Sequence, residues 1–488
     1  MRFLILLLAG AASVLAYAPF EQFWLMPLSW GVLYALLRET DARPKRAFFS
    51  GWAWGCGALF AGLCWLVVAL NRFGGLSAPL SVLLILLFCV ALALYPALVS
   101  ALFARLRPSH WLARAAIAAA CWTLGELLRG QLFPAFPWLA IGYTQTPPSP
   151  LAGWAAVLGV YGISALLAFS AALLVEAWKL PSARRVALAL AILPWAAGAG
   201  LRQIDWTTPV GEPVSVALIQ TNVAQDQKWL AETLMAQLEL NAELLRRNPA
   251  RIMVMPESSL PMFEQNLPAG YLDLLTAQAR DAGGDAILGV FTSDAGGGVY
   301  NSVITRGVSP AQVYSKNHLV PFGEFQPWGF GWFFQLASIP MANQTPGGDH
   351  QPLLALAGQK VAMNICYEDV FGEELRRALP EATLMVNVSN LAWYGDSHAQ
   401  PQHLQMSRIR ALESGRPQLR ATNTGMTAVV QPDGEVSDVL PAFTQGAIRT
   451  QVRGYQGVTP FVAVGDWPIK LLVLLVLLWG VVRARKVA

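Results

Sequence analysis

The sequence predicts a polytopic α-helical membrane protein of about eight spans that carries one large α/β domain outside the cytoplasm. Two observations support this fold class. Of the 488 residues, 55% are apolar and only 13% are charged, whereas soluble domains are about 25% charged. Eight apolar stretches are also long enough to cross a bilayer, and about 260 residues without such a stretch separate the last two.

The apolar stretches set the expected division of the chain. They cover residues 3–19, 22–38, 48–70, 79–104, 112–128, 151–178, 186–201 and 468–482. We therefore expect membrane helices in 1–203, a soluble domain in 204–466 and a last membrane helix in 467–488. The first stretch also fits a signal peptide, because Arg2 precedes its apolar core and Ala16-Tyr17-Ala18 resembles a cleavage site. Cleavage would leave seven spans with the soluble domain on the same side.

Basic residues gather on one side of these spans. Short cytoplasmic loops carry an excess of Lys and Arg, so such residues report orientation. The clusters are Arg2; Arg38, Arg43, Lys45 and Arg46; Arg105, Arg107 and Arg114; Lys179, Arg184 and Arg185; and Arg483, Arg485 and Lys486. The loops on the other side are poor in charge. We therefore expect the soluble domain to face outward, as in a bacterial inner membrane with this domain in the periplasm.

The segment over 204–466 alternates short apolar runs with helical patterns. The runs read as buried strands that end in polar residues, at Val214–Ile219, Ile252–Met255, Ile287–Phe291, Val361–Ile365 and Leu384–Val388. Helical patterns cover Glu232–Arg247, Leu272–Ala282 and Val370–Leu379. This alternation predicts an α/β architecture with functional groups at the strand ends.

Three motifs in this domain carry candidate chemical groups. They are Val254–Ser258 (VMPES), Tyr314–Glu324 (YSKNHLVPFGE) and Asn364–Asp369 (NICYED). In their order and spacing, these motifs resemble the Glu, Lys and Cys motifs of the nitrilase superfamily. With seven spans before the domain and one after it, the whole chain resembles the apolipoprotein N-acyltransferase family. This resemblance implies an αββα sandwich for the soluble domain.

The residue types explain the expected chemistry. Of five cysteines, Cys366 alone lies outside the spans, and a thiol needs a base or a positive neighbour to become a nucleophile. Glu257 is the candidate base. Lys316 would place a positive charge where the carbonyl oxygen becomes negative. We therefore expect a Glu–Lys–Cys acyl-transfer site at these residues.

Further residues are candidates for support and for substrate binding. The resemblance implies that Glu324 and Glu368 orient Lys316 and the nucleophile, and it marks Trp229 and Asn301 as substrate-binding candidates. Tyr367 directly follows the nucleophile. An aromatic segment over 325–341 suits an interfacial lid, with Phe325, Trp328, Phe330, Trp332, Phe333 and Phe334. Trp393 and Tyr394 form a second candidate of this kind. The segment over 325–341 also fits a hydrophobic core loop.

The resemblance implies acyl transfer from a phospholipid, through a Cys366 thioester, to the N-terminal amine of a diacylglyceryl-cysteine apolipoprotein. The alternatives are a membrane-tethered nitrilase-like amidase, a Cys–His protease, and a transporter with an outer domain. We expect no cofactor. We also expect no metal, because His398 and His403 lack the spacing of a zinc helix. With a net charge of only +4 and no aromatic-rich basic patch, we expect no nucleic-acid partner.

Overall fold

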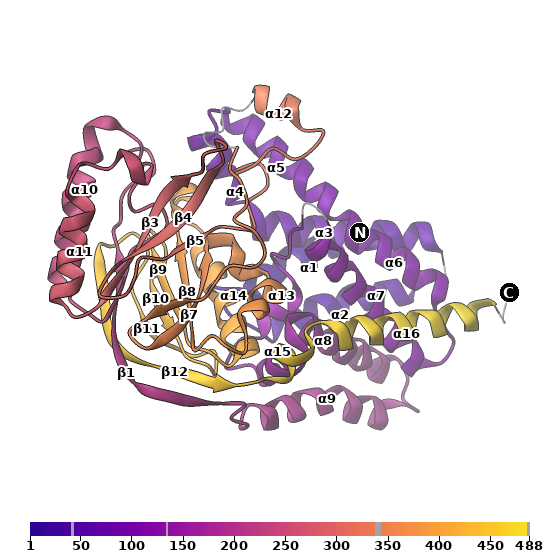
Figure 1. The fold of residues 1–488 in the computed structure, drawn as a ribbon. Helices are drawn as coiled ribbons and strands as arrows, with labels where there is room; N and C mark the ends of the chain where they lie inside the picture. The colour runs from indigo at the N-terminus through magenta and orange to yellow at the C-terminus, as the bar shows by residue number, and fades with distance from the viewer. Residues whose placement is uncertain (41–42, 133–134, 337–342, 486–488) are drawn as a thin grey trace. The chain divides into compact units, whose positions relative to one another are not determined.

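The computed structural model describes residues 1–40, 43–132, 135–336 and 343–485. Contacts divide the chain into two compact units. The membrane unit comprises residues 1–67, 77–205 and 460–488, and the α/β unit comprises residues 68–76 and 206–459. Figure 1 traces both units along the chain.

The membrane unit is mainly helical in its described residues. Its helices are α1 (Arg2–Ala12), α2 (Leu25–Arg38), α3 (Pro44–Leu63), α5 (Ala78–Leu92), α6 (Leu94–Leu106), α7 (Trp111–Gln131), α8 (Ala155–Lys179), α9 (Arg184–Leu201), α15 (Pro460–Val464) and α16 (Trp467–Arg485). Helices α1 and α3 approach closely at two glycines. A Cβ atom at Gly10 would lie 2.0 Å from the carbonyl oxygen of Trp54, and one at Gly57 would lie 2.0 Å from that of Leu7. Small residues at crossings of this kind are typical of helices packed in a membrane.

Six of the eight predicted spans have a counterpart among the described helices. Five helical segments are long and apolar enough to cross a membrane, and a sixth counts if α3 and the helical segment Leu66–Phe73 form one span with a 61° bend. The first two predicted spans are instead shorter apolar helices, Arg2–Ala16 and Leu25–Arg38. At 1.5 Å per residue, the 14 residues of α2 rise about 21 Å, less than the roughly 30 Å of a bilayer core. The expected count of eight is therefore not reached.

Buried charge inside the membrane unit is held in an ion-pair cluster around Glu176. Arg114 donates to both oxygens of Glu176, each at 2.8 Å. Tyr34 donates its hydroxyl to the same carboxylate at 2.7 Å, and Arg38 approaches at 3.3 Å. Each carboxylate oxygen thus has a cationic donor, which is how a buried charge is normally accommodated in a protein.

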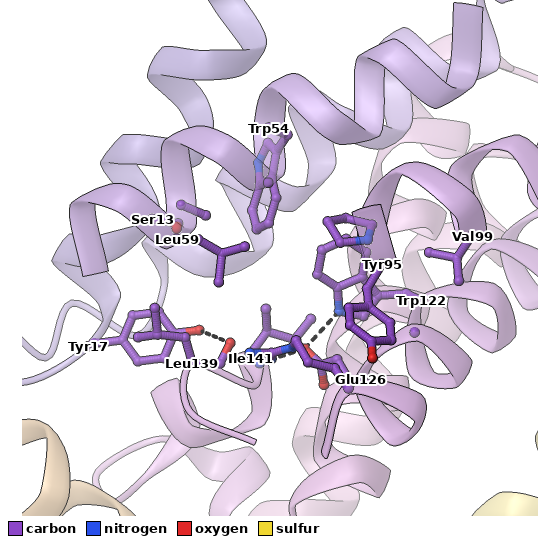
Figure 2. Close-up of a pocket in the computed structure, with 15 residues that line it drawn as sticks. Ser13, Tyr17, Trp54, Leu59, Tyr95, Val99, Trp122, Glu126, Leu139 and Ile141 are labelled. Carbon is purple, nitrogen blue, oxygen red and sulfur yellow. Dashed lines mark hydrogen bonds between the residues drawn. The ribbon is translucent and has the colours of Figure 1, made fainter. Parts of the chain in front are cut away.

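A second carboxylate lines a cavity in the membrane unit, shown in Figure 2. Glu126 accepts hydrogen bonds from the Trp122 indole at 3.0 Å and from the Ile141 N–H at 2.8 Å. Tyr17, on the same cavity wall, donates to the Leu139 carbonyl at 2.9 Å. One oxygen of Glu126 and the Tyr17 hydroxyl are therefore bonded to other groups of the same unit.

The α/β unit contains two six-stranded mixed sheets within its described residues. The first has the order β12-β1-β2-β3-β4-β5 and the second β11-β10-β9-β8-β7-β6. Their strands are β1 (Thr207–Gln220), β2 (Ile252–Val254), β3 (Asp285–Ser293), β4 (Val299–Gly307), β5 (Val313–Ser315), β6 (Leu354–Leu356), β7 (Gln359–Ile365), β8 (Leu384–Ser389), β9 (Gln418–Thr422), β10 (Ala428–Val430), β11 (Val436–Val439) and β12 (Gly446–Gly457). Strands β1–β3 are parallel neighbours, as are β7–β9, and the other pairs are antiparallel.

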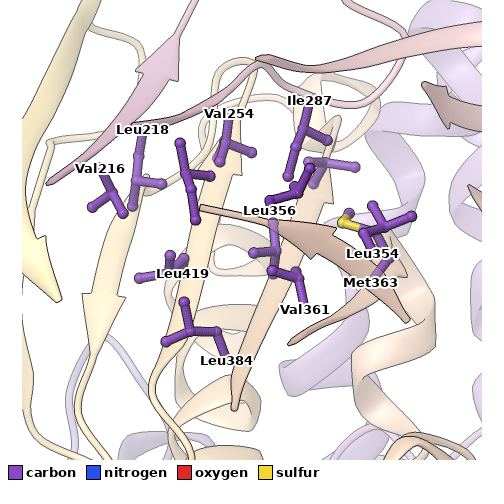
Figure 3. Close-up of a cluster of buried hydrophobic side chains, with 14 of the residues drawn as sticks. Val216, Leu218, Val254, Ile287, Leu354, Leu356, Val361, Met363, Leu384 and Leu419 are labelled. Atoms are coloured by element: carbon purple, nitrogen blue, oxygen red, sulfur yellow. The ribbon is translucent and has the colours of Figure 1, made fainter. Parts of the chain in front are cut away.

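Alternating side chains build the core of this unit. Val216 and Leu218 of β1 belong to an apolar cluster that they share with residues such as Val361 and Leu384 of the second sheet (Figure 3). The intervening residues of β1 face the helices that cover the first sheet. Because side chains alternate along a strand, one apolar run can serve both faces.

Helices cover the outer faces of both sheets. Helices α10 (Ala231–Arg247) and α11 (Tyr271–Asp281) bury Leu238 and Leu275 against the first sheet, and α14 (Ala399–Ser414) buries Leu404 against the second. This is the predicted αββα sandwich. The helix predicted over Val370–Leu379 is wrong in detail, because the chain there forms a 3₁₀ turn η6 (Cys366–Val370), the short α13 (Gly372–Leu375) and a second turn, η7 (Arg376–Ala378).

Candidate active site

The three candidate chemical groups lie where strands end. Glu257 follows β2 by three residues, Lys316 directly follows β5, and Cys366 directly follows β7. The first two strands belong to one sheet and the third to the other. Lys316 Nζ lies 3.6 Å from Glu257 Oε1 within the first sheet. The αββα packing adds residues of the second sheet, because the charges of Glu257 and Lys316 act on Cys366 and the Asn390 N–H, after β8, bonds to Glu257.

The backbone has an unusual conformation at two of these strand ends. Cys366 has φ 56° and Ser258, next to Glu257, has φ 45°, a region that non-glycine residues rarely adopt. Gly289 makes room for the Glu257 turn, because a Cβ atom there would lie 2.4 Å from the Pro256 oxygen and 2.5 Å from the Ser258 nitrogen. Backbone strain of this kind concentrates at functional sites.

The Glu257 carboxylate is buried and is held at both oxygens. Asn301 donates its side-chain amide to Oε1 at 2.7 Å, and the main-chain N–H of Asn390 donates to Oε2 at 2.7 Å. The side-chain amide oxygen of Asn301, Oδ1, is buried and has no hydrogen-bond partner among the described residues. A buried polar atom without a partner usually signals a bound water or substrate group.

Lys316 is almost fully buried and pairs with two carboxylates. Its Nζ donates to Glu324 Oε1 at 2.6 Å, and Glu324 Oε2 accepts the Val320 N–H at 2.7 Å. Burial alone would lower the pKa of Lys316, but Glu324 and then Glu257 outweigh this effect and raise the pKa above its ordinary value. Lys316 is therefore a fixed positive charge at neutral pH.

The Cys366 thiol is under opposing influences. Burial, and next the negative charge of Glu257, raise the pKa of Cys366 well above its usual range, while Lys316 lowers it. The Asn390 N–H that bonds to Glu257 also lowers the pKa of Cys366, and Asn387 donates its side chain to the Cys366 carbonyl at 3.2 Å. The Cys366 thiol is therefore protonated at rest, and the charges of Glu257 and Lys316 act on it.

Glu368 connects the lysine motif to the cysteine turn. Its Oε1 accepts the N–H groups of Asn317 at 2.7 Å and His318 at 3.1 Å, and its Oε2 accepts the Ile365 N–H at 2.6 Å. Burial raises the pKa of Glu368 to about 7 against the lowering effect of these bonds. Glu368 therefore holds the main chain on both sides of the site, whereas the Tyr367 ring lies 5.1 Å from Phe371 in aromatic packing.

The predicted substrate-binding residues have different surroundings. Asn301 touches Glu257, as described above. Trp229 is 39% exposed and packs on Phe291 at 5.7 Å. Trp393 packs edge-on against Phe73, with ring centroids 5.5 Å apart. Burial, and next the charge of Cys366, raise the pKa of Tyr394. Tyr394 is therefore close enough to Cys366 for that charge to act on it. Trp393 and Tyr394 belong to the 3₁₀ turn η8 (Leu391–Tyr394) that follows β8.

The aromatic segment after the lysine motif is largely exposed in its described part. Trp328 is 94% exposed, and Trp332, in the short helix α12 (Gly331–Leu336), is 57% exposed. Residues 337–341 of the predicted lid lie outside the described residues. Exposed tryptophans are unusual on a solvated surface and common where proteins meet the bilayer interface.

Comparison with known proteins identifies both parts of the chain. A family model described as the apolipoprotein N-acyltransferase N-terminal domain matches residues 9–173, and one described as carbon-nitrogen hydrolase matches residues 215–455. The apolipoprotein N-acyltransferase of Nitrosomonas europaea is 45% identical over 97% of this chain and 96% of its own length. The chain belongs to the apolipoprotein N-acyltransferase family.

Two further members of this family are similar over nearly their whole length. The Chromobacterium violaceum protein is 44% identical over 98% of this chain and 95% of its own, and the Ralstonia nicotianae protein is 42% identical over 98% and 93%. The predicted family is thereby confirmed, and so is the carbon-nitrogen hydrolase fold. These relatives and the long apolar helices identify a bacterial membrane protein and an acyltransferase of the nitrilase superfamily.

Two residues of the site were missed as functional candidates in the sequence. Asn390 follows β8 directly, so its position at a strand end was a usable signal, although its main-chain N–H matters rather than its side chain. Lys228 precedes Trp229, lies in no regular element and donates to the Glu257 carbonyl at 3.1 Å. Nothing in its sequence context separates it from a surface lysine.

Proposed function

We propose that this chain moves an acyl chain from a phospholipid to the N-terminal amine of a diacylglyceryl-cysteine apolipoprotein, in two half-reactions joined by a Cys366 thioester. The observation that carries the proposal is the buried cluster of Glu257, Lys316 and Cys366 in a chain of the apolipoprotein N-acyltransferase family. A membrane-bound donor and acceptor also suit a domain attached to several apolar helices.

In the first half-reaction, Cys366 Sγ attacks the ester carbonyl carbon of the phospholipid. Glu257 takes the thiol proton, and negative charge develops on the carbonyl oxygen, which Lys316 and the main-chain N–H after Cys366 stabilise. The carbon–oxygen bond of the ester then breaks, and Glu257 returns the proton to the leaving alcohol. The products are a lysophospholipid and the acyl-enzyme.

In the second half-reaction, the α-ammonium of the acceptor loses one proton to Glu257 and attacks the thioester as a free amine. The carbon–sulfur bond breaks, and the sulfur recovers a proton from the new amide nitrogen. Glu257 then releases its proton to water. Asn301 and Asn390, which hold the two oxygens of Glu257, keep the base in the same place for both steps.

Water must stay away from the thioester, which would otherwise hydrolyse. Trp328 and Trp332 extend from the chain that follows the lysine motif, and we assign them to the lipid headgroup region of the outer surface. Trp229 and Trp393 would then contact the acyl chains of the two substrates.

The function is tested with purified protein in detergent and a phospholipid of defined acyl chains. We expect one lysophospholipid released per enzyme and an acyl adduct on the peptide that contains Cys366, detected by mass spectrometry. Adding a diacylated lipopeptide should discharge the adduct and give the triacylated product. Steady release of free fatty acid in place of amide formation would favour the hydrolytic amidase alternative.

The orientation is tested on intact spheroplasts. The proposal of a periplasmic domain in the inner membrane requires that single cysteines introduced on the α/β unit, in a background without the native cysteines, react with an impermeant maleimide before lysis. A cysteine introduced beside Arg184 serves as the matched cytoplasmic control. Labelling of the α/β unit only after permeabilisation would contradict this orientation.

A further inference from the structure

Lys228 is a buried ammonium that the three-residue mechanism does not use. It lies between β1 and α10, only 2% of its surface is exposed, and its Nζ donates to the main-chain oxygen of Glu257 at 3.1 Å. That oxygen belongs to the turn in which Ser258 has φ 45°. Lys228 thus contacts the residue that is proposed as the base, from the side of its main chain.

The loop that carries Lys228 is held in place. The side chain of Gln237 on α10 donates to the carbonyls of Gln227 at 3.1 Å and Lys228 at 3.2 Å. The side chain of Asn423 bonds to both main-chain groups of Val223. It accepts a hydrogen bond from the Val223 N–H and donates one to the Val223 carbonyl, each at 2.8 Å. These bonds hold the Lys228 main chain at both ends of the loop.

Space filling alone does not account for a lysine here. Removing an ammonium from water costs several kcal/mol, and a residue such as methionine fills a similar volume without that cost. Burial lowers the pKa of Lys228 to about 8, against the opposing effects of Glu257 and Cys366. Lys228 is therefore charged below about pH 8 and neutral above it.

The charges around Cys366 give Lys228 a role. Glu257 and Glu324 both disfavour a negative sulfur, and Lys316 favours it. Lys316 pairs with these two carboxylates, Glu257 at 3.6 Å and Glu324 at 2.6 Å. The charges that act on Lys228 are those of Glu257, from the turn after β2, and of Cys366, from the end of β7. Its ammonium supplies the second positive charge that brings these side chains toward neutrality.

We propose that Lys228 is a positioning residue for acyl transfer, which holds Glu257 through its main-chain carbonyl and supplies the charge that keeps Cys366 reactive at neutral pH. The idea rests on the proposed function of Cys366 as the nucleophile, but its test needs no lipid substrate. It predicts that losing the Lys228 charge makes Cys366 less reactive wherever wild-type Lys228 is protonated.

The experiment measures alkylation of Cys366 by iodoacetamide from pH 6 to pH 10, read at the Cys366 peptide by mass spectrometry. Lys228→Gln keeps a side-chain N–H but removes the charge, and Lys228→Met removes both. We expect alkylation to fall about tenfold at pH 7 in both variants, as for a shift of one pKa unit in the thiol. The difference from wild type should disappear above about pH 8, where the pKa of Lys228 makes the wild type neutral too.

Lys360→Met is the matched control, because Lys360 is exposed on β7 and its loss changes the net charge equally. It should leave the alkylation profile unchanged. Thermal unfolding should show Lys228→Met to be as stable as wild type or more so. A Gln profile equal to wild type, a loss that is equal at every pH, or failure of both variants to fold would each overturn the proposal. Absence of acylation by phospholipid would instead count against the proposed function alone.

Discussion

Glu176 of the membrane unit and Glu257 of the α/β unit are both buried carboxylates beside a cation, but they are held differently. Arg114 donates two hydrogen bonds of 2.8 Å to Glu176, and Tyr34 donates a third of 2.7 Å. Glu257 has its cation, Lys316, at 3.6 Å and accepts its short bonds from neutral amides. Glu324 takes the closer contact with Lys316 instead.

The difference suits Glu176 to a structural role and leaves the Glu257 carboxylate able to accept a proton. A guanidinium with two parallel bonds stabilises the ionised carboxylate and prevents it from accepting a proton. Amide donors orient a carboxylate without a full opposing charge, so it can still take a proton from a neighbouring thiol. Four substitutions test this difference. They are described in order of their expected effect on acyl transfer.

Cys366→Ser should abolish the covalent intermediate. A serine hydroxyl has a far higher pKa than a thiol, and a carboxylate activates it poorly. Mass spectrometry of the intact protein after incubation with phospholipid measures the adduct. An acyl group on any residue other than Cys366 would contradict the assignment.

Glu257→Gln should slow thioester formation by roughly 10²–10⁴-fold, as expected for loss of a general base. The amide keeps the shape of the side chain and can accept one of the two hydrogen bonds that Glu257 accepts, but it cannot accept the proton. Since burial and Glu257 itself raise the pKa of Cys366, the rate should recover partly at high pH, where the thiol ionises unaided. Single-turnover acylation across pH measures this, and a wild-type rate at neutral pH would exclude the base role.

Lys316→Arg should slow acylation by about 10²–10³-fold, comparable to loss of one oxyanion donor. The positive charge remains, but a planar guanidinium would bind Glu324 in two-point geometry and resemble the Arg114–Glu176 pair. The same single-turnover assay applies. Near-normal thioester formation would mean that Lys316 serves only the structure.

Glu176→Gln should leave acylation of the folded protein unchanged but lower its stability. Removing one partner of a buried ion pair leaves Arg114 uncompensated, at a cost of about 3–5 kcal/mol. Thermal unfolding in detergent, compared with Glu257→Gln under the same conditions, measures the effect. A variant with normal stability and slow acylation would reverse the roles assigned to the two carboxylates.

The amino-acid sequence alone predicted the classes of structure and named the candidate chemical residues. Apolar length predicted six spans that have helical counterparts, because the bilayer imposes a minimum length on any helix that crosses it. The run Val214–Ile219 predicted β1, and the apolar run before Cys366 predicted β7, since buried strands need continuous apolar residues. Motif order pointed to Glu257, Lys316 and Cys366 without any coordinates.

The pairing of charges became visible only in the folded structure. No spacing in the chain relates Glu176 to Arg114, or Lys228 to Glu257, because these pairs come from elements that meet only after folding. The first two apolar stretches likewise became shorter helices, α1 with its 3₁₀ extension and α2. Hydrophobicity is a property of each residue and can be read directly from the sequence. Burial and the pairing of charges depend on which elements pack together in the fold.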